Sequence, residues 1–180
     1  LMSKISKIKS ISIWIFILPF LSINICLILS TQFHQIYSNQ EFKLFNSLWP
    51  YVDGGTSISR VARPFPNWLI FKPAMFLTSF LLIKYWLYNK GIISDFDKNY
   101  KHIKKIVFFG VGSAVALIIH SIFLGIEIDN NLYKLFRRVI MFVFIIFEIT
   151  AQAYLVTALY SFKEELSKFI NIKVLRLKLI

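Results

Sequence analysis

The sequence predicts an all-α membrane protein, a bundle of four transmembrane helices with both chain ends in the cytoplasm. Hydrophobic residues make up 57% of the 180 residues and aromatic residues 17%, which is more apolar surface than a soluble domain of this length can bury. These residues also fall into long runs that are almost free of charge, as expected for helices surrounded by lipid. We therefore predict a single membrane domain over residues 1–180.

Four apolar runs are long enough to span a bilayer. They cover approximately residues 11–30, 68–88, 106–126 and 139–162. The first run has no Lys, Arg, Asp or Glu between Lys9 and Glu41, and it contains Pro19, which membrane helices tolerate. It is too long for a signal-peptide core and lacks a small-x-small cleavage site, so we predict an uncleaved helix.

The start of the second run is ambiguous because Lys72 and Pro73 interrupt it. The helix can begin near Trp68 and bend at Pro73. Alternatively, it can begin at Pro73, which suits a first helical residue, and leave residues 68–72 at the interface. The sequence leaves both starts open.

Two polar segments flank these runs. Residues 31–67 form a long loop with dense turn chemistry and many aromatic residues. Residues 163–180 alternate basic and apolar side chains, which predicts a basic amphipathic tail lying on the membrane surface. A fifth transmembrane helix is possible only if this charged tail enters the lipid.

The basic residues predict the orientation. The net charge is +12, and most of the 21 Lys and Arg residues flank the apolar runs and do not line one soluble face. This pattern indicates membrane topology and anionic headgroups as partners, and it argues against nucleic acid. With both ends inside, fourteen of them are cytoplasmic and seven are outside. The loop over residues 31–67 then faces outward.

Ionisable groups inside an apolar run are candidates for function because they are costly to insert unless paired. Glu148 lies near the middle of the fourth run, and Gln152 follows one turn later on the same face. His120 lies in the third run and Asn24 in the first. Glu148 can bind a proton or a lipid headgroup, or it can simply make a structural hydrogen bond to another helix. His120 and Glu148 can face each other if the third and fourth helices are antiparallel neighbours.

The outward loop and the residues after it form a second candidate site. Consecutive glycines expose backbone N–H groups, and nearby cations can hold the phosphate of a lipid headgroup. The residues of this predicted site are Asp53, Gly54, Gly55, Arg60, Arg63 and Lys72. The alternative is that they form a turn followed by interfacial anchors.

The sequence contains no recognisable catalytic set. Cys26 is the single cysteine, so neither an internal disulfide nor a cysteine-based zinc site can form. There is no His-Glu-x-x-His motif, His cluster or Ser-His-Asp order. We therefore predict no metal, no cofactor and a non-enzymatic role.

The segment around the loop resembles a known family. The residues that carry the resemblance are Pro50-Tyr51-Val52-Asp53-x-Gly55, then Ser57 or Ser59, Pro64 or Pro66, and Ile70-Phe71-Lys72-Pro73-Ala74-Met75. This pattern is similar to the loop before the second helix of the FRAG/DRAM-type family, and the similarity covers residues 11–90. That family has five or six helices, so the second half of this chain departs from it. The resemblance implies a lipid-linked or membrane-organising role without catalytic residues to carry over.

We therefore expect an integral membrane protein that binds or organises lipid. One alternative is an accessory subunit of a larger membrane complex, with other membrane proteins as partners. Another is a small proton-coupled transporter that uses Glu148 and acts as an oligomer. The abundance of Ile, Lys, Phe and Asn suggests an AT-rich genome, which suits a bacterium or an organelle. We expect a bacterial inner membrane, with an organellar membrane as the alternative.

Overall fold

The protein is helical throughout the part that the structure describes. The computed structural model describes residues 2–33, 58–126, 128 and 130–166, of which 87% are helical and none is in a strand. The long helices are α1 (Met2–Gln32), α3 (Asn67–Phe96), α4 (Ile103–Phe123) and α5 (Asn131–Ser161), and the short ones are α2 (Ile58–Val61) and α6 (Lys163–Leu166). The predicted all-α fold is confirmed.

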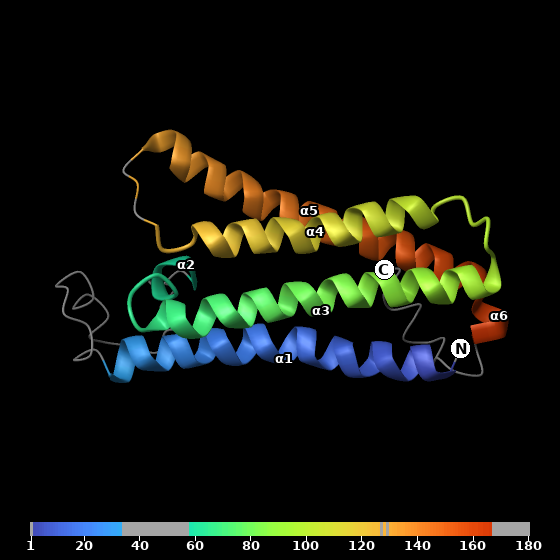
Figure 1. Cartoon of the computed structure of the whole chain (residues 1–180), viewed down its shortest axis with the longest axis horizontal. Helices are drawn as coiled ribbons and strands as arrows, with labels where there is room; N and C mark the ends of the chain where they lie inside the picture. The colour runs from blue at the N-terminus through green and yellow to red at the C-terminus, as the bar shows by residue number, and fades with distance from the viewer. Residues whose placement is uncertain (1, 34–57, 127, 129, 167–180) are drawn as a thin grey trace.

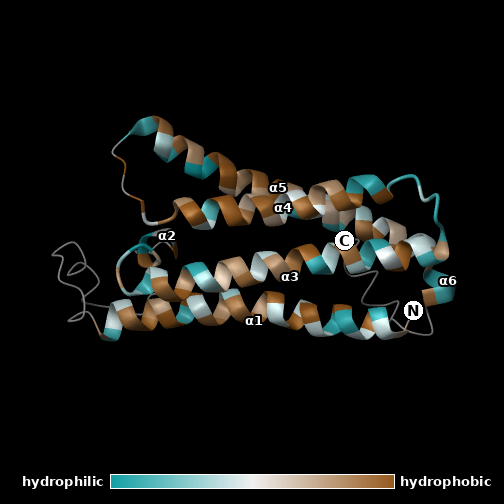
Figure 2. Ribbon diagram, viewed as in Figure 1, coloured by the Kyte–Doolittle hydropathy of each residue, from teal (hydrophilic) through white to brown (hydrophobic). Residues whose placement is uncertain are grey.

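Each of the four long helices is long and apolar enough to cross a membrane. Figure 2 shows hydrophobic residues along their central parts and hydrophilic residues mostly towards their ends. A helix satisfies all its backbone hydrogen bonds internally, which is what a span requires in lipid. The chain is therefore an integral membrane protein by the character of its helices, as the sequence predicted.

The long helices run antiparallel in chain order, so that each lies beside the next (Figure 1). The main interfaces are α1 with α3, α3 with α4, and α4 with α5. Because four crossings return the chain to its starting side, the N-terminus and α6 lie at the same end of the molecule. We call this the inner end, following the predicted orientation, and the opposite end the outer end.

Two clusters of buried side chains form the core, one in each half of the molecule. The outer cluster joins α1, α2, α3 and α4 and contains Cys26, Leu27, Val61, Ala62, Phe71, Met75, Leu117 and Leu124. The inner cluster joins α3, α4 and α5 and contains Leu82, Trp86, Ile93, Ile106, Ala114, Ala151, Leu155 and Ala158. Alanine recurs on α4 and α5 because small side chains let helices approach closely in a membrane.

The helices extend beyond the apolar runs. Of the two starts considered for the second span, the structure has the earlier one, because α3 begins at Asn67 and contains Pro73. Residues 131–138, which precede the fourth apolar run, form the first turns of α5, and the side chain of Asn130 caps this helix by accepting from the Leu132 N–H at 2.9 Å. Hydropathy marks only the part of a helix that lies in the lipid core, whereas the capping residue determines where the helix begins.

The polar segments are described only in part. Residues 34–57 of the predicted outward loop and residues 167–180 of the predicted tail lie outside the described residues. The end of the loop forms α2 and a turn into α3, and the start of the tail forms α6. The question of a fifth crossing therefore also falls outside the described residues.

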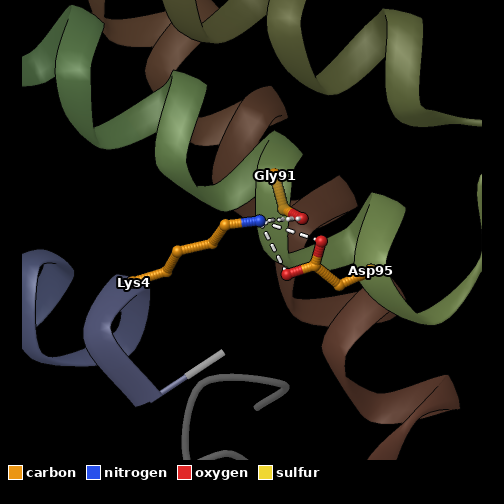
Figure 3. A network of polar contacts seen from close by, with 3 residues as sticks. All are labelled: Lys4, Gly91 and Asp95. Carbon is orange, nitrogen blue, oxygen red and sulfur yellow. Dashed lines mark hydrogen bonds and ion pairs between the residues drawn. The ribbon is translucent and has the colours of Figure 1, made fainter.

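An ion pair joins α1 to α3 at the inner end. The ammonium of Lys4 donates to both carboxylate oxygens of Asp95, at 2.8 and 2.7 Å, and lies 3.4 Å from the carbonyl oxygen of Gly91. Figure 3 shows the Lys4 side chain reaching across from α1 to these two residues on α3. Each partner keeps 39% of its side chain exposed, so water and salt screen the attraction.

Replacing Lys4 by alanine is expected to lower the thermal stability only slightly, and the loss should disappear in high salt. Lys9→Ala removes the same charge from an exposed position on the same helix and provides the control. Thermal unfolding in detergent at low and high salt compares the two variants. A large loss for Lys4→Ala that persists in high salt would contradict this expectation.

Candidate functional sites

The first candidate site is a polar cluster around Glu148 in the middle of α5. The carboxyl group of Glu148 is half-buried and faces α4. Its Oε2 lies 2.7 Å from the hydroxyl of Ser113, which is fully buried on α4. Its Oε1 accepts a hydrogen bond from the side-chain amide of Gln152 at 2.9 Å. The one-turn spacing of Glu148 and Gln152 thus places both on the face that meets α4.

A third helix contributes to this cluster. Tyr85 of α3 lies close to Gln152 and Glu148 of α5 and to Asn89 of its own helix. Tyr85 precedes Trp86, whose fully buried ring packs on the backbone of α4 at Gly110. The absence of a side chain at Gly110 therefore brings α3 close enough to α4 for Tyr85 to reach residues of α5.

Ser113 and Tyr85 are members of this cluster that the sequence reasoning missed. Serine is common in membrane helices, and Tyr85 lies near the end of the second apolar run, where aromatic residues are common. The available signal was the run Gly110-Val111-Gly112-Ser113-Ala114, since small residues mark the face of a membrane helix that packs closely on another.

The other two intramembrane polar residues lie elsewhere. His120 is buried on α4 beside Arg137 of α5. It lies two turns closer to the outer end than Ser113. The residue of α4 that faces Glu148 is therefore Ser113 and not His120. Asn24 lies on α1, where its amide donates to the carbonyl of Phe20 at 2.6 Å. α1 packs mainly on α3, whereas α5 packs mainly on α4 (Figure 1). Glu148 and Gln152 therefore share a site, whereas His120 and Asn24 belong to other parts of the molecule.

The second candidate site is a group of basic side chains at the outer end, which we call the outer basic cluster: Arg63, His120 and Arg137. Arg63 follows α2, is half-buried and lies near Arg137 of α5. His120 in turn interacts with the backbone of Arg137. The Nδ1 atom of His120 is buried and has no hydrogen-bond partner among the described residues.

The backbone around this cluster is tightly arranged. Gly125, just after α4, adopts a φ of 86°, and a side chain there would contact the carbonyl oxygen of Arg63. Glycine adopts this conformation without strain. The chain can therefore turn out of α4 directly against the segment that carries Arg63.

Several residues of the predicted loop site have other positions. Asp53, Gly54 and Gly55 lie outside the described residues, and Arg60 is exposed on α2. The ammonium of Lys72 lies 3.3 Å from the carbonyl oxygen of Ile122 and 5.6 Å from the centroid of the Trp68 ring. Lys72 thus neutralises the C-terminal end of α4, where carbonyl groups lack helical partners. Arg137, which is not among the residues of the predicted loop site, is the basic residue of α5 that lies near Arg63.

No group of three or more His, Cys, Asp or Glu side chains among the described residues could hold a metal ion. No protein-family model matches the chain, and no curated protein or solved structure is significantly similar to it. The fold and the two polar clusters thus define the class, an integral membrane protein with four long apolar helices.

Proposed function

We propose that this protein binds the phosphate of an anionic lipid headgroup through the outer basic cluster and has no enzymatic role. The observation that carries the proposal is the proximity of Arg63 and Arg137, which come from different elements and lie near the buried His120. The resemblance of residues 50–75 to a FRAG/DRAM-type loop supports the same lipid-linked role. In a bacterial inner membrane this end would face the periplasm.

The chemistry of the cluster suits a phosphate. Each guanidinium presents its donors in a planar fork that matches two phosphate oxygens, and such charge-assisted hydrogen bonds are roughly twice as strong as neutral ones. His120 adds a ring nitrogen that has no partner among the described residues.

The depth of the cluster also suits a headgroup. With 31 residues, α5 is about 46 Å long, whereas the hydrocarbon core of a bilayer is about 30 Å thick. If α5 is centred in the bilayer, about 8 Å extends past the core at each end. Arg137 is the seventh residue of α5 and lies about 9 Å from its start. It would therefore sit at the boundary between the core and the headgroups.

A pair of double variants tests this proposal. Arg63→Ala with Arg137→Ala removes both guanidinium groups from the cluster, and Lys134→Ala with Arg138→Ala removes two positive charges from exposed positions of α5. Binding of phosphatidylglycerol to the full chain in detergent is measured by native mass spectrometry. Because a hydrogen bond to a charged group contributes about 1.5–3 kcal/mol, the first variant should bind at least about tenfold more weakly.

The control variant, Lys134→Ala with Arg138→Ala, should bind phosphatidylglycerol almost as well as the parent protein. Arg63→Lys with Arg137→Lys keeps the charge but loses the forked geometry, and it should bind with intermediate affinity. Circular dichroism shows whether each variant remains folded. Equal affinity in both alanine double variants would overturn the proposal, because any loss would then reflect net charge alone.

A further inference from the structure

The hydroxyl group of Ser113 has two oxygen neighbours. Its Oγ lies 2.8 Å from the carbonyl oxygen of Gly110 and 2.7 Å from Oε2 of Glu148. Both distances are typical of O–H···O hydrogen bonds. A serine hydroxyl carries one proton and can donate only once, and neither a carbonyl nor an ionised carboxylate has a proton to give. Both contacts can be hydrogen bonds at the same time only if Glu148 supplies the second proton.

With Glu148 ionised, Ser113 would donate to the carboxylate. Its lone pairs would then face the Gly110 carbonyl at 2.8 Å with no proton between the two oxygens. With Glu148 protonated, its Oε2–H donates to Ser113, and Ser113 donates to Gly110, which is the local bond that serine commonly makes in helices. Gln152 donates to Oε1 at 2.9 Å in either case. The polar atoms in this series of hydrogen bonds all have suitable partners only when Glu148 is protonated.

The surroundings of Glu148 lead to the same conclusion. Among the described residues, Glu148 forms no ion pair with Lys, Arg or His. Its polar neighbours among the described residues are the hydroxyl of Ser113 on α4 and the amide of Gln152 on α5. The titratable group of α3 that lies near it is Tyr85. An ionised carboxylate without a cationic partner is costly inside a membrane. Binding a proton removes that charge.

We propose that Glu148 is an intramembrane proton-binding site at the interface of α4 and α5. The proton on Glu148 is hydrogen-bonded to Ser113, whose own proton is directed to Gly110. When a base from the surrounding water takes the proton of Glu148, the hydroxyl of Ser113 turns from Gly110 to the carboxylate. The α4–α5 interface would then have two hydrogen-bonding states that depend on one proton. This site is separate from the outer basic cluster and does not depend on lipid binding there.

Infrared spectroscopy of the full chain in phosphatidylcholine vesicles tests this assignment, because a protonated carboxyl group has a carbonyl band separate from that of a carboxylate. We expect the parent protein to show this band and Glu148→Gln to lack it. Ser113→Ala should keep the band but shift it, because the acid loses its hydrogen-bond acceptor. Glu165→Gln changes an exposed acid on α6 and should leave the spectrum of the band unchanged.

Raising the pH should remove the band from the parent protein reversibly, and this measurement requires no variant to fold. The absence of a protonated-acid band in the parent protein at neutral pH would overturn the proposal. Its persistence in folded Glu148→Gln would do so as well, since the proton would then belong to another residue. An unshifted band in folded Ser113→Ala would contradict the proposed Glu148–Ser113 hydrogen bond.

Discussion

Replacing Gly110 by alanine is expected to lower the free energy of unfolding by about 2 kcal/mol, through a clash between α3 and α4. A Cβ atom at this position would overlap the indole ring of Trp86, including Cε2 at 2.7 Å, and Trp86 is fully buried. The overlapping atoms belong to the rigid body of the ring and not to the end of a flexible side chain. Either Trp86 leaves its rotamer or the two helices move apart. Titration with a denaturing detergent, followed by circular dichroism, measures the loss.

Gly112→Ala is the matched control for this change. Both substitutions lie in α4, and each carries the intrinsic gain of about 1 kcal/mol that alanine has over glycine within a helix. The added Cβ at Gly112 would meet the ring edge of Phe147 at 2.8 and 2.9 Å, and Phe147 is only half-buried and can turn aside. Gly112→Ala should therefore be the more stable variant. Trp86→Leu should relieve the defect of Gly110→Ala, and a failure to do so would contradict the assignment to Trp86.

Replacing Asn67 by alanine is expected to be similarly damaging, at about 2–3 kcal/mol. Asn67 is the first residue of α3 and is completely buried. Its side-chain amide lies 2.7 Å from the carbonyl oxygen of Val61, 2.8 Å from the hydroxyl of Ser30 and 3.2 Å from the carbonyl oxygen of Cys26. One side chain thus connects α1, α2 and α3. Alanine would remove the two N–H donors that these buried acceptors share, which costs more than the net value of the bonds themselves.

Asn89→Ala provides the comparison, because Asn89 is also buried on α3 but its amide donates to the Tyr85 carbonyl, within its own helix, at 2.8 Å. The same titration should show a clearly smaller loss for Asn89→Ala than for Asn67→Ala. Cysteine accessibility gives a second measurement, since Cys26 is buried and lies 3.6 Å from the backbone oxygen of Asn67. The thiol should react faster in Asn67→Ala. An unchanged reactivity together with an equal loss in both variants would rule out this role for Asn67.

These two residues show what hydropathy does not reveal. Gly110 and Asn67 appear unremarkable in the sequence, one within an apolar run and the other at the end of a polar loop. Their importance comes from neighbours that are distant in the sequence. Trp86 lies 24 residues before Gly110, and Ser30 and Cys26 lie 37 and 41 residues before Asn67. Contacts of this kind depend on the rotation and depth of each helix relative to the next. Composition and periodicity within one helix do not contain that information.

The two polar sites were predictable to different degrees. Glu148 stands out in the sequence as an acid in an apolar run, and Gln152 follows from helical spacing. Ser113 and Tyr85 became part of that site only through the packing of α4 and α3. Similarly, Arg137 was visible as a cation near a helix start, but nothing local connects it with Arg63, which precedes it by 74 residues.

The sequence by itself determined the class of this protein, because the exclusion of apolar runs from water depends on composition and length, which are local properties of the chain. It also determined that the chain makes four long helices with both described ends on one side. Tertiary structure alone decided which polar groups meet, because a shift of one residue along a helix turns each side chain by about 100°. The partners of Glu148 and Arg63 follow from the close approach of helices at small residues such as Gly110, and therefore from the packing of the whole molecule.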